Sequence, residues 1–322
     1  MLTGVPLSLL DRSRTRTGGP PDRRDADALR ATLRRARRAD ELGLHRFWVA
    51  EHHAVPGVVG SAPTVTMAAV AGVTSRIRVG TAGVMLPNHS PFVVAEQIAT
   101  LAALHPGRID VGIGRSLGFT APVRRALGTT GTDGFADRLA ELLDWLHGRG
   151  PVTVRPQVPA PPVWSLATGS GLEVAARLGL PVVVGGPLLR DPTALQRYRE
   201  QFPQGRITLL LDVLVADSDT RARRELLPQA VALARSRSRG DFGPLPSPQE
   251  AQATVLTARE RADVDRALAD TVFGDEATVA QRLRDLLDRT GAQELLAATT
   301  LHDEGAEAEA DARLSGLLRT AG

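Results

Sequence analysis

The sequence HRFWVAEHH, from His45 to His53, decides how the rest of the chain is interpreted. Residues 47–49 are bulky and apolar, as in a short buried strand. Glu51, His52 and His53 follow directly, so a carboxylate and two imidazoles stand where this strand ends. A fold that gathers the ends of several strands in one place would make these three side chains part of a site.

The order of an apolar strand, a polar turn and a helix recurs along the chain. Strands are expected at residues 5–10, 47–49, 77–86, 108–114, 163–167, 181–184, 207–215 and 294–300. Helical periodicity is found at residues 25–42, 62–73, 91–104, 133–147, 172–178, 193–202, 219–235 and 276–287, and in a last helix that ends at 317. Because eight strand–helix units close a barrel, we predict an α/β fold, a single (β/α)8 TIM barrel over residues 1–322.

Two further stretches bear on this prediction: one supports the barrel, and the other interrupts its pattern. The first turn, DRSRTRTGG at residues 11–19, lacks the GxGxxG that is usual in doubly wound open sheets, which argues for the barrel. From Ser236 to Ala262 the chain loses periodicity and gathers Pro, Gly, Ser and Arg. A long irregular run inside a compact domain is usually functional, so residues 236–262 are predicted to be a mobile loop or lid inserted near the C-terminal third.

Composition excludes several classes of function. The chain has no cysteine, which rules out disulfides, thiolate metal sites and cysteine nucleophiles. All 39 basic residues are arginine, but the formal net charge is only +3 and acids are interleaved, so no nucleic-acid partner is expected. No signal-peptide core is present and no apolar run reaches the roughly 18 residues of a membrane helix. A cytoplasmic protein without a membrane partner is the expectation.

The Glu51-His52-His53 triplet is the first candidate site. Active sites of such barrels lie at the C-terminal ends of the strands, where this triplet falls. Imidazole titrates near neutral pH, and an adjacent carboxylate can fix its tautomer, so acid–base chemistry is expected. A metal site would need a third ligand such as His89, Asp110 or Glu96. Because no HxxxH or HExxH spacing occurs, no metal is predicted.

Glycine-rich strand ends form a second group of candidates. Residues 80–91 (GTAGVMLPNHSP) and 112–115 (GIGR) place small residues at neighbouring strand ends, which indicates either room for a flat ligand or tight barrel packing. Arg115 could hold a phosphate or form an ion pair. The loop 167–171 (ATGSG) joins a strand to a helix N-terminus, where free N–H groups suit an anion, although such loops also serve only as helix caps.

Three blocks of the sequence, taken together, resemble the bacterial luciferase-like flavin monooxygenase family. They are AEHHAVPGVVGSAP at 50–63, IRVGTAGVMLPNHSPFVVAEQIATLAALHPGRIDVGIGR at 77–115, and VWSLATGSGLEVAARLGLPVVV at 163–184. They occur in the order and at the spacing of the family, and the likeness is weak beyond about residue 215. Within the family the chain looks most like the natural-product tailoring oxygenases.

The resemblance implies a barrel that binds reduced FMN, or in some relatives F420, at its C-terminal face. His52 matches the residue implicated in flavin hydroperoxide chemistry at C4a, with Glu51 or His53 expected to fix its tautomer. The family's strand beneath the isoalloxazine ring carries a non-prolyl cis peptide, expected here between Ala82 and Gly83. The cofactor-binding residues implied by the resemblance are Thr81, Ala82, Gly83, Arg115, Thr168, Gly169 and Ser170.

The chain departs from the family pattern at a few positions. Ser90 stands where the luciferase catalytic subunit has a histidine before proline, Gly114 replaces a cysteine, and Gly171 replaces a hydroxyl residue. The turn 116–120 reads SLGFT in place of a Pro-Gly-Thr-Asp-like sequence.

The function that the resemblance implies is a two-component flavin-dependent monooxygenase. Reduced FMN from a flavin reductase and O2 would oxidise a small organic substrate, in natural-product biosynthesis. An F420-dependent oxidoreductase and a non-catalytic luciferase-like subunit are the alternatives. A homodimer is also expected, with the small-residue helix at 62–73 as a plausible interface.

Overall fold

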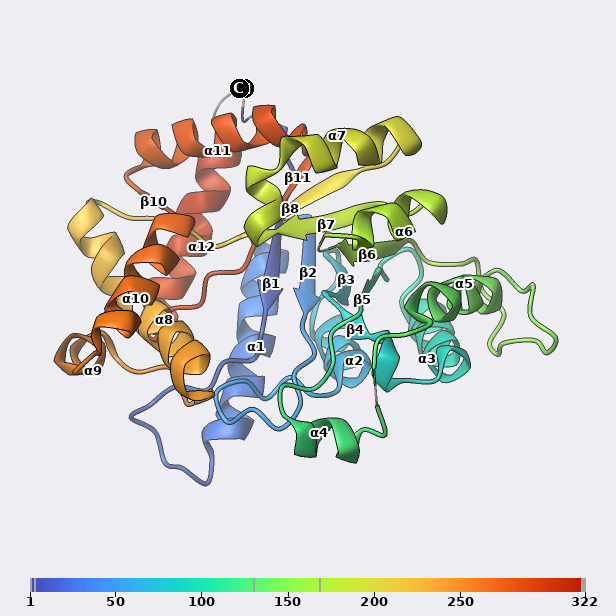
Figure 1. Cartoon of the computed structure of the whole chain (residues 1–322), viewed down its shortest axis with the longest axis horizontal. Helices are drawn as coiled ribbons and strands as arrows, with labels where there is room; N and C mark the ends of the chain where they lie inside the picture. The colour runs from blue at the N-terminus through green and yellow to red at the C-terminus, as the bar shows by residue number, and fades with distance from the viewer. Residues whose placement is uncertain (1, 3, 130, 168, 320–322) are drawn as a thin grey trace.

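The computed structural model describes residues 2, 4–129, 131–167 and 169–319, and parallel strands form its centre (Figure 1). The strands of the main sheet are β1 (Leu7–Asp11), β2 (Arg46–Val49), β3 (Arg78–Thr81), β4 (Val84–Met85), β5 (Val111–Gly114), β6 (Val163–Ala167), β7 (Val182–Gly185), β8 (Ile207–Leu211) and β11 (Glu294–Ala297). They pair in the order β3-β2-β1-β11-β8-β7-β6-β5-β4, all in parallel.

The sheet is closed into a barrel where β3 meets β5. A β-bridge joins Val79 to Ile109, and the Thr81 hydroxyl donates a hydrogen bond of 2.8 Å to the carbonyl of Gly112. β3 and β4 are two parts of one strand, interrupted at the peptide between Ala82 and Gly83. The nine hydrogen-bonded segments therefore make the eight barrel strands that the sequence predicts, and the predicted barrel is confirmed.

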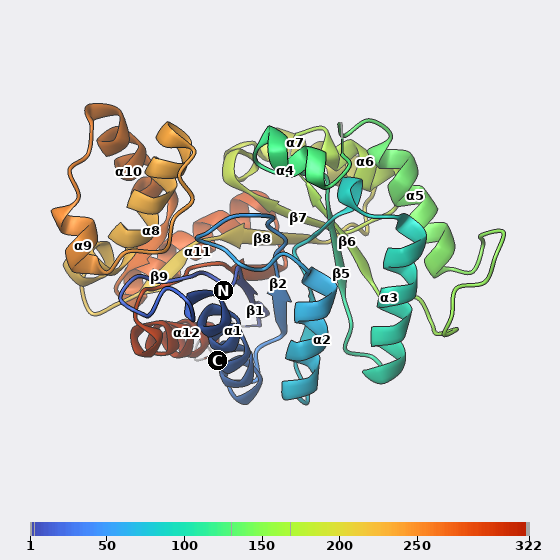
Figure 2. The same cartoon turned by 90° about the horizontal axis from the view of Figure 1, so that it is seen from below.

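Helices follow the strands and surround the barrel, as Figures 1 and 2 show. The surrounding helices are α1 (Arg24–Glu41), α2 (Pro63–Val73), α3 (Pro91–Leu104), α5 (Phe135–Leu146), α6 (Gly171–Arg177), α7 (Pro192–Gln201), α11 (Glu276–Thr290) and α12 (Glu304–Arg319). Gly43 follows α1 with φ +64°, a left-handed conformation that suits glycine and ends the helix as predicted. Every residue of β1, β2, β5 and β11 is buried, because helices cover one side of these strands and the barrel interior the other.

The barrel interior changes from charged to apolar along its axis. At the N-terminal ends of the strands, Arg46 forms buried ion pairs with Asp110 and with Glu294, the latter at 3.0 Å. Its guanidinium also lies over the Trp164 ring, 4.5 Å from the ring centroid. Towards the C-terminal ends the interior is apolar, with Trp48 and Ala82 among its buried side chains. This cluster around Arg46 thus lies at the opposite end of the barrel from the predicted site.

A second unit stands beside the barrel (Figure 2). Its elements, which we call the helical unit, are β9 (Val213–Val215), α8 (Asp219–Arg239), α9 (Pro248–Ala253), α10 (Ala258–Asp270) and β10 (Val272–Gly274). β9 pairs with β10 in a separate two-stranded parallel sheet, and the three helices have an apolar cluster of their own. The predicted strand at 207–215 is therefore two strands, of which only the first belongs to the barrel.

The expectation that residues 236–262 lack regular structure is wrong. α8 continues to Arg239, α9 lies within the span, and α10 begins at Ala258. Both α9 and α10 begin with capping boxes, Ser247 with Glu250 and Thr257 with Glu260, so the start signals were present in the sequence. The short helix α4 (Ala121–Ala126) and the strand β10 were also missed. Within the described residues, no helix is both long enough and apolar enough to cross a bilayer.

Candidate functional site

A cavity of about 1320 Å³ lies between the C-terminal ends of the barrel strands and the helical unit. The barrel side of its wall includes Arg12, Met85, Arg115, Asp212 and Ala298, which follow or end different strands. α8 and α10 contribute to the other side. Small-molecule sites usually measure about 300–1,000 Å³, so this cavity has room for a large cofactor and a second molecule.

The floor of the cavity is apolar. Leu166, Val183, Leu210 and Ala298 line it and belong to the apolar cluster inside the barrel that also contains Ala82. The predicted strand segment at 81–83 therefore lies beneath the cavity rather than in its outer wall. The peptide bond between Ala82 and Gly83 is cis, as the resemblance implied.

The glycines near this floor are explained by close packing. A Cβ on Gly83 would lie 2.7 Å from the carbonyl oxygen of Gly112, and one on Gly112 would lie 2.0 Å from that of Thr81. The Thr81 hydroxyl also accepts a hydrogen bond of 3.1 Å from the Gly112 N–H, so its polar atom is used between strands. Of the two interpretations of the glycine-rich strand ends, tight barrel packing accounts for these positions.

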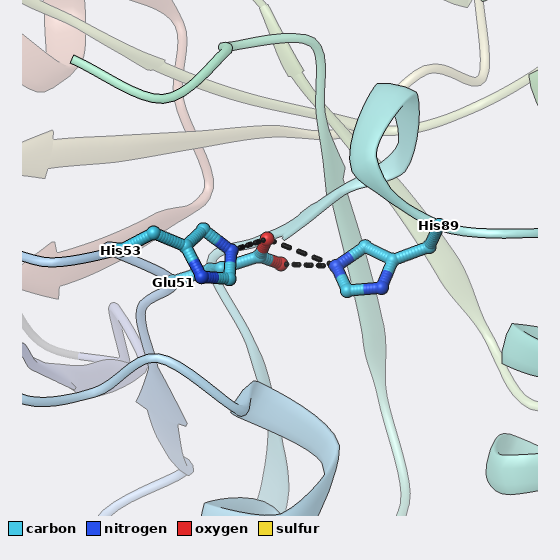
Figure 3. A group of neighbouring side chains, drawn as sticks. All are labelled: Glu51, His53 and His89. Carbon is cyan, nitrogen blue, oxygen red and sulfur yellow. Dashed lines mark hydrogen bonds and ion pairs between the residues drawn. The ribbon is translucent and has the colours of Figure 1, made fainter. Parts of the chain in front are cut away.

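Glu51 is the centre of the hydrogen-bond network beside the cavity (Figure 3). Its buried carboxylate accepts a hydrogen bond of 2.8 Å from the backbone N–H of Met85. The Nε2 atoms of His53 and His89 lie 2.6 Å and 2.9 Å from the carboxylate oxygen Oε1. Asn88 also donates to this oxygen, at 3.3 Å. One carboxylate thus joins the loop after β2 to the end of β4 and to η1 (Leu86–Asn88).

This network keeps Glu51 ionised. Burial opposes ionisation of Glu51, but the hydrogen bonds from His89, Met85 and His53 outweigh it, so the pKa of Glu51 lies below its usual value. An ionised carboxylate only accepts hydrogen bonds, so both imidazoles must carry a proton on Nε2. Their Nδ1 atoms are then left as acceptors when the rings are neutral.

His52 lies apart from this network. The Nδ1 atom of His52 is buried and has no hydrogen-bond partner among the described residues. Burial, and then the positive charges of Arg12 and Arg14, lower the pKa of His52 to about 4. The imidazole is therefore neutral at physiological pH. The expectation that Glu51 or His53 fixes the tautomer of His52 is wrong, because Glu51 binds His53 and His89 instead.

An aromatic ring, Phe119, covers His52, and a second aromatic ring packs against Phe119. The ring of Phe119 stacks on the imidazole with 5.8 Å between centroids and 10° between planes, and Phe242 lies 4.6 Å from Phe119. Residues around Phe242 are tied to the loop after His53, where the N–H of Gly57 donates to the Phe242 carbonyl. The segment between α8 and α9 thus lies over the loop that carries the two histidines.

Arg115 and Ser170 meet at the mouth of the barrel. Nη1 of Arg115 donates a hydrogen bond of 3.1 Å to the Ser170 hydroxyl, which joins the ends of β5 and β6. Arg115 lines the cavity, and Gly169 has φ +52°, a conformation that favours glycine. Thr168, predicted in the same group, lies outside the described residues. α6 has only seven residues, and the Ser170 side chain does not cap it.

Glu51, His53 and His89 also form a donor set of the kind that divalent metals take. Their ligand atoms all lie within 4.8 Å of one another. In the structure, however, the two Nε2 atoms and the carboxylate already satisfy one another as donors and acceptor. We therefore interpret the group as a hydrogen-bonded triad, and the absence of a metal stays a prediction.

Sequence reasoning missed several residues of the site. His89 was considered only as a possible metal ligand. It follows a predicted strand and a polar turn, and this position indicates a place at the same end of the barrel as Glu51. Asn88 is oriented by a hydrogen bond of 3.0 Å from the Thr129 hydroxyl, a contact between distant segments that local patterns do not show. Phe119 and Arg12 lie in loops, where sequence gives no direction for a side chain.

Comparison with known proteins gives consistent matches over most of the chain. A family model described as luciferase-like monooxygenase matches residues 7–294. A luciferase-like monooxygenase of Escherichia coli (strain K12) is 36% identical over 301 residues, covering 87% of this chain and 88% of that protein. The crystal structure of apo-MsnO8 has a TM-score of 0.85 and 33% identity, covering 97% of this chain and 98% of its own.

Two further solved structures share the fold at low identity, each with a cofactor. One is the oxygenating constituent of 3,6-diketocamphane monooxygenase from Pseudomonas putida in complex with FMN, with a TM-score of 0.74, 18% identity and 97% of each chain covered. The other is an F420-dependent secondary alcohol dehydrogenase in complex with an F420–acetone adduct, with a TM-score of 0.64 and 16% identity. It covers 98% of this chain and all of its own.

Proposed function

The chain belongs to the luciferase-like monooxygenase family, and we propose on this basis that it is a flavin-dependent monooxygenase. Reduced FMN and O2 would serve to oxidise a small organic substrate, as in natural-product tailoring. The observation that carries the proposal is His52, a neutral imidazole with an unpartnered buried Nδ1 atom at the barrel mouth. A group in this state is poised to exchange a hydrogen bond or a proton with a bound ligand.

The residues around the cavity fit a flavin mononucleotide. Arg115 and the Ser170 hydroxyl supply a cation and a polar donor for a phosphate at the mouth. The floor formed by Leu166, Val183 and Leu210 gives an apolar surface for a flat ring system. Bound reduced flavin supplies the reaction of O2 that a protein side chain cannot perform. F420 carries a ring system of similar shape, so cofactor identity is decided by titration.

The protein groups then have separate tasks. His52 would accept or donate one hydrogen bond at Nδ1 towards the reacting part of the cavity. Because the imidazole is neutral, Nδ1 can accept a hydrogen bond, and a bound ligand with negative charge would raise the pKa of His52 and so let it take a proton and return it. The Glu51 triad would hold the loop after β2 against β4 and so fix the backbone that carries His52. Phe119 and Phe242 would keep water from the imidazole, which supports productive use of O2.

Within residues 236–262, the part that would serve as a lid is the segment between α8 and α9. This segment contacts the loop after His53, because the Gly57 N–H donates a hydrogen bond to the Phe242 carbonyl. It also contacts the loop after β1, where the Leu245 N–H donates to the Thr15 carbonyl and the Leu245 carbonyl accepts from the Thr17 N–H. We propose that this segment covers the site during the reaction and moves to admit substrate.

Partners follow from the same proposal. A separate flavin reductase would supply reduced FMN, since the described residues form one barrel and its helical unit. We also propose a homodimer. α2 exposes Val65, Ala68, Ala69 and Gly72, and neighbouring α3 exposes Val93, so an apolar face is available for a second copy. Light scattering of wild type and of Ala69→Glu tests it, and a monomeric wild type would refute it.

The activity is tested by supplying reduced flavin to the purified protein. Binding of reduced FMN and of reduced F420 is measured by anaerobic spectral titration, and hydrogen peroxide release is followed after mixing with O2. Wild type should bind reduced FMN and retain it through reaction with O2. His52→Ala should change the rate of that reaction by about 10²-fold or more, the usual scale of acid–base catalysis.

His105→Ala, which changes a histidine at the end of α3, is the matched control. Failure of wild type to bind either cofactor would overturn the proposed function. Unchanged reaction rates in His52→Ala would remove His52 from the mechanism while leaving the cofactor assignment in place.

A further inference from the structure

Three arginines alternate along the loop after β1, and they differ in their partners. Nη2 of Arg16 lies 3.3 Å from both carboxylate oxygens of Glu307, which also lies 3.5 Å from Arg35. Arg12 donates a hydrogen bond of 2.8 Å to the carbonyl of Ala298 but reaches an acid only at 4.0 Å, at Asp212. Arg14 has no ion pair among the described residues, and its Nη2 atom is buried without any hydrogen-bond partner.

Arg12 and Arg14 therefore share one distant counter-charge. Burial lowers the pKa of Arg14 to about 10, the charges of Arg12 and Arg16 act in the same direction, and Asp212 acts against them. Asp212 itself has a buried oxygen, Oδ1, that makes no hydrogen bond among the described side chains. Two guanidinium groups and one carboxylate leave an excess of one positive charge. A buried charge without a partner is costly, and a bound anion removes that cost.

The loop that carries Arg12 and Arg14 runs beside the loop that follows His52, because the Val59 N–H donates to the Ser13 carbonyl and Arg14 forms a β-bridge with Val58. Both arginines lie close enough to His52 for their charges to lower its pKa, and Arg12 and Asp212 line the cavity. His52 has its own unpartnered buried atom, Nδ1. Arg14, His52 and Asp212 thus each have an unsatisfied polar atom, and Arg12 and Asp212 place this group of loops at one edge of the cavity.

The wall of the whole cavity favours anions. Eight arginines and four aspartates line it among the described residues, and two of these aspartates are already paired, Asp263 with Arg266 and Asp270 with Arg190. Arg237, Arg259 and Arg289 lie in the part of the wall formed by the helical unit and α11. A cleft whose wall carries an excess of positive charge concentrates ligands of negative charge.

The chemistry of the pair selects a singly charged group. A guanidinium matches the planar geometry of a carboxylate, with two parallel hydrogen bonds. Arg12 and Arg14 exceed Asp212 by one positive charge, and Asp212 would repel the second negative charge of a dianion. A carboxylate balances the site, whereas a dianionic phosphate or sulfate would exceed it.

We propose that Arg12 and Arg14 bind a carboxylate of the substrate next to His52, so that the enzyme acts on organic acids. This assignment rests on the proposed function, because it names the substrate class of the same site. Arg115 and Ser170, on the opposite part of the barrel mouth, remain free for the cofactor phosphate.

The test compares acids with their neutral amides in the flavin-free, full-length protein. Benzoate and benzamide, and octanoate and octanamide, are titrated by calorimetry, and the pKa of His52 is followed by NMR with and without each ligand. In wild type at least one acid should bind about tenfold or more tightly than its amide, the effect of one hydrogen bond to a charged group. The bound acid should also raise the pKa of His52, because it brings a negative charge near the imidazole.

Arg12→Gln and Arg14→Gln should each reduce the preference for the acid to less than about threefold, since the glutamine has no charge. Arg30→Gln, which changes an exposed arginine of α1 paired with Asp27, is the matched control and should keep the preference. Thermal unfolding shows whether the variants fold. Arg14→Gln should be as stable as wild type or more so, because the repulsion from Arg12 is removed.

The proposal is overturned if no acid is preferred over its amide, or if the preference survives both substitutions. Binding of sulfate as tight as that of benzoate would overturn the choice of a singly charged carboxylate. Because FMN binding is measured separately, the failure of this assignment and the failure of the proposed function give different results.

Discussion

The imidazole of His52 lies against the ring of Phe119, with their centroids 5.8 Å apart and their planes within 10° of parallel. Burial is the largest cause of the low pKa of His52, and Phe119 supplies part of that burial. Phe119→Ala should therefore raise the pKa of His52 from about 4 towards its ordinary value near 6.5. NMR titration of the imidazole measures this. Phe119→Leu, which keeps an apolar cover, should keep most of the shift, and an unchanged pKa in Phe119→Ala would contradict the prediction.

The low pKa of His52 also has a consequence for stability. The folded-state pKa lies below the unfolded value, so the unfolded chain binds the extra proton first as the pH falls. Wild type should lose stability between about pH 6.5 and pH 4 through this group, by up to about 3 kcal/mol, and no more below pH 4. His52→Asn lacks this loss. The difference in free energy of unfolding between wild type and His52→Asn, from urea titrations at several pH values, should shrink accordingly, and a constant difference would show that His52 is not buried.

Glu51→Gln should destabilise the barrel mouth. The amide has one acceptor oxygen in place of two, and its NH2 group faces the N–H donors of His53, His89 and Met85. A loss of about 2–3 kcal/mol is expected, the scale for hydrogen bonds to a buried charged group. Urea unfolding at neutral pH measures it. Glu96→Gln, on the outer side of α3, is the control and should change stability little.

Arg115 should distinguish FMN from riboflavin, which differ only in the phosphate. Wild type should bind FMN more tightly, and Arg115→Ala should lose about 10–100-fold in FMN affinity with little change for riboflavin. Ser170→Ala should show a smaller effect in the same direction, because its hydroxyl orients Arg115. Fluorescence titration provides both affinities. Equal losses for FMN and riboflavin would place Arg115 away from the phosphate.

The Glu51 triad should function without a metal. Dialysis against EDTA should leave the rate of the flavin-dependent reaction unchanged, and metal analysis of the purified protein should find no stoichiometric ion. Added Zn²⁺ should compete with the proton on each Nε2 atom and so inhibit the reaction. Loss of activity in EDTA with recovery on adding one metal would contradict the hydrogen-bonded interpretation.

The barrel was predictable because its signals are local. Strands buried on both sides are short apolar runs between polar turns, and Ile207–Leu211 is an example. The departure of β9 from the barrel was not predictable, since Val213–Val215 continues the same apolar pattern after a single aspartate. α9 and α10 were hidden by the Gly- and Pro-rich residues before them, although their capping boxes were visible.

The sequence predicted where the site lies, but not which of its side chains form hydrogen bonds with one another. His52 follows β2 as expected, and the loop after it runs beside the loop of the cavity residue Arg12. The partner of Glu51, however, is His89, which is 38 residues further along the chain. The closure of the barrel brings Glu51 and His89 together. If either strand ended one residue earlier or later, its side chain would point away from the other. The orphaned atoms of Arg14 and His52 could not be found from sequence, because a missing partner is a property of the folded chain.

Because of the way the helical unit is attached, mutations that change the cavity wall can be separate from mutations that affect folding of the barrel. β9 leaves the barrel directly after Asp212 and β10 pairs with it alone, so the hydrogen bonds of β8 and β11 do not pass through α8, α9 or α10. Mutations in this unit can reshape one wall of the cavity without shifting the register of any barrel strand. Selection for a new substrate can therefore act on the appended helices, while selection for folding acts on the barrel.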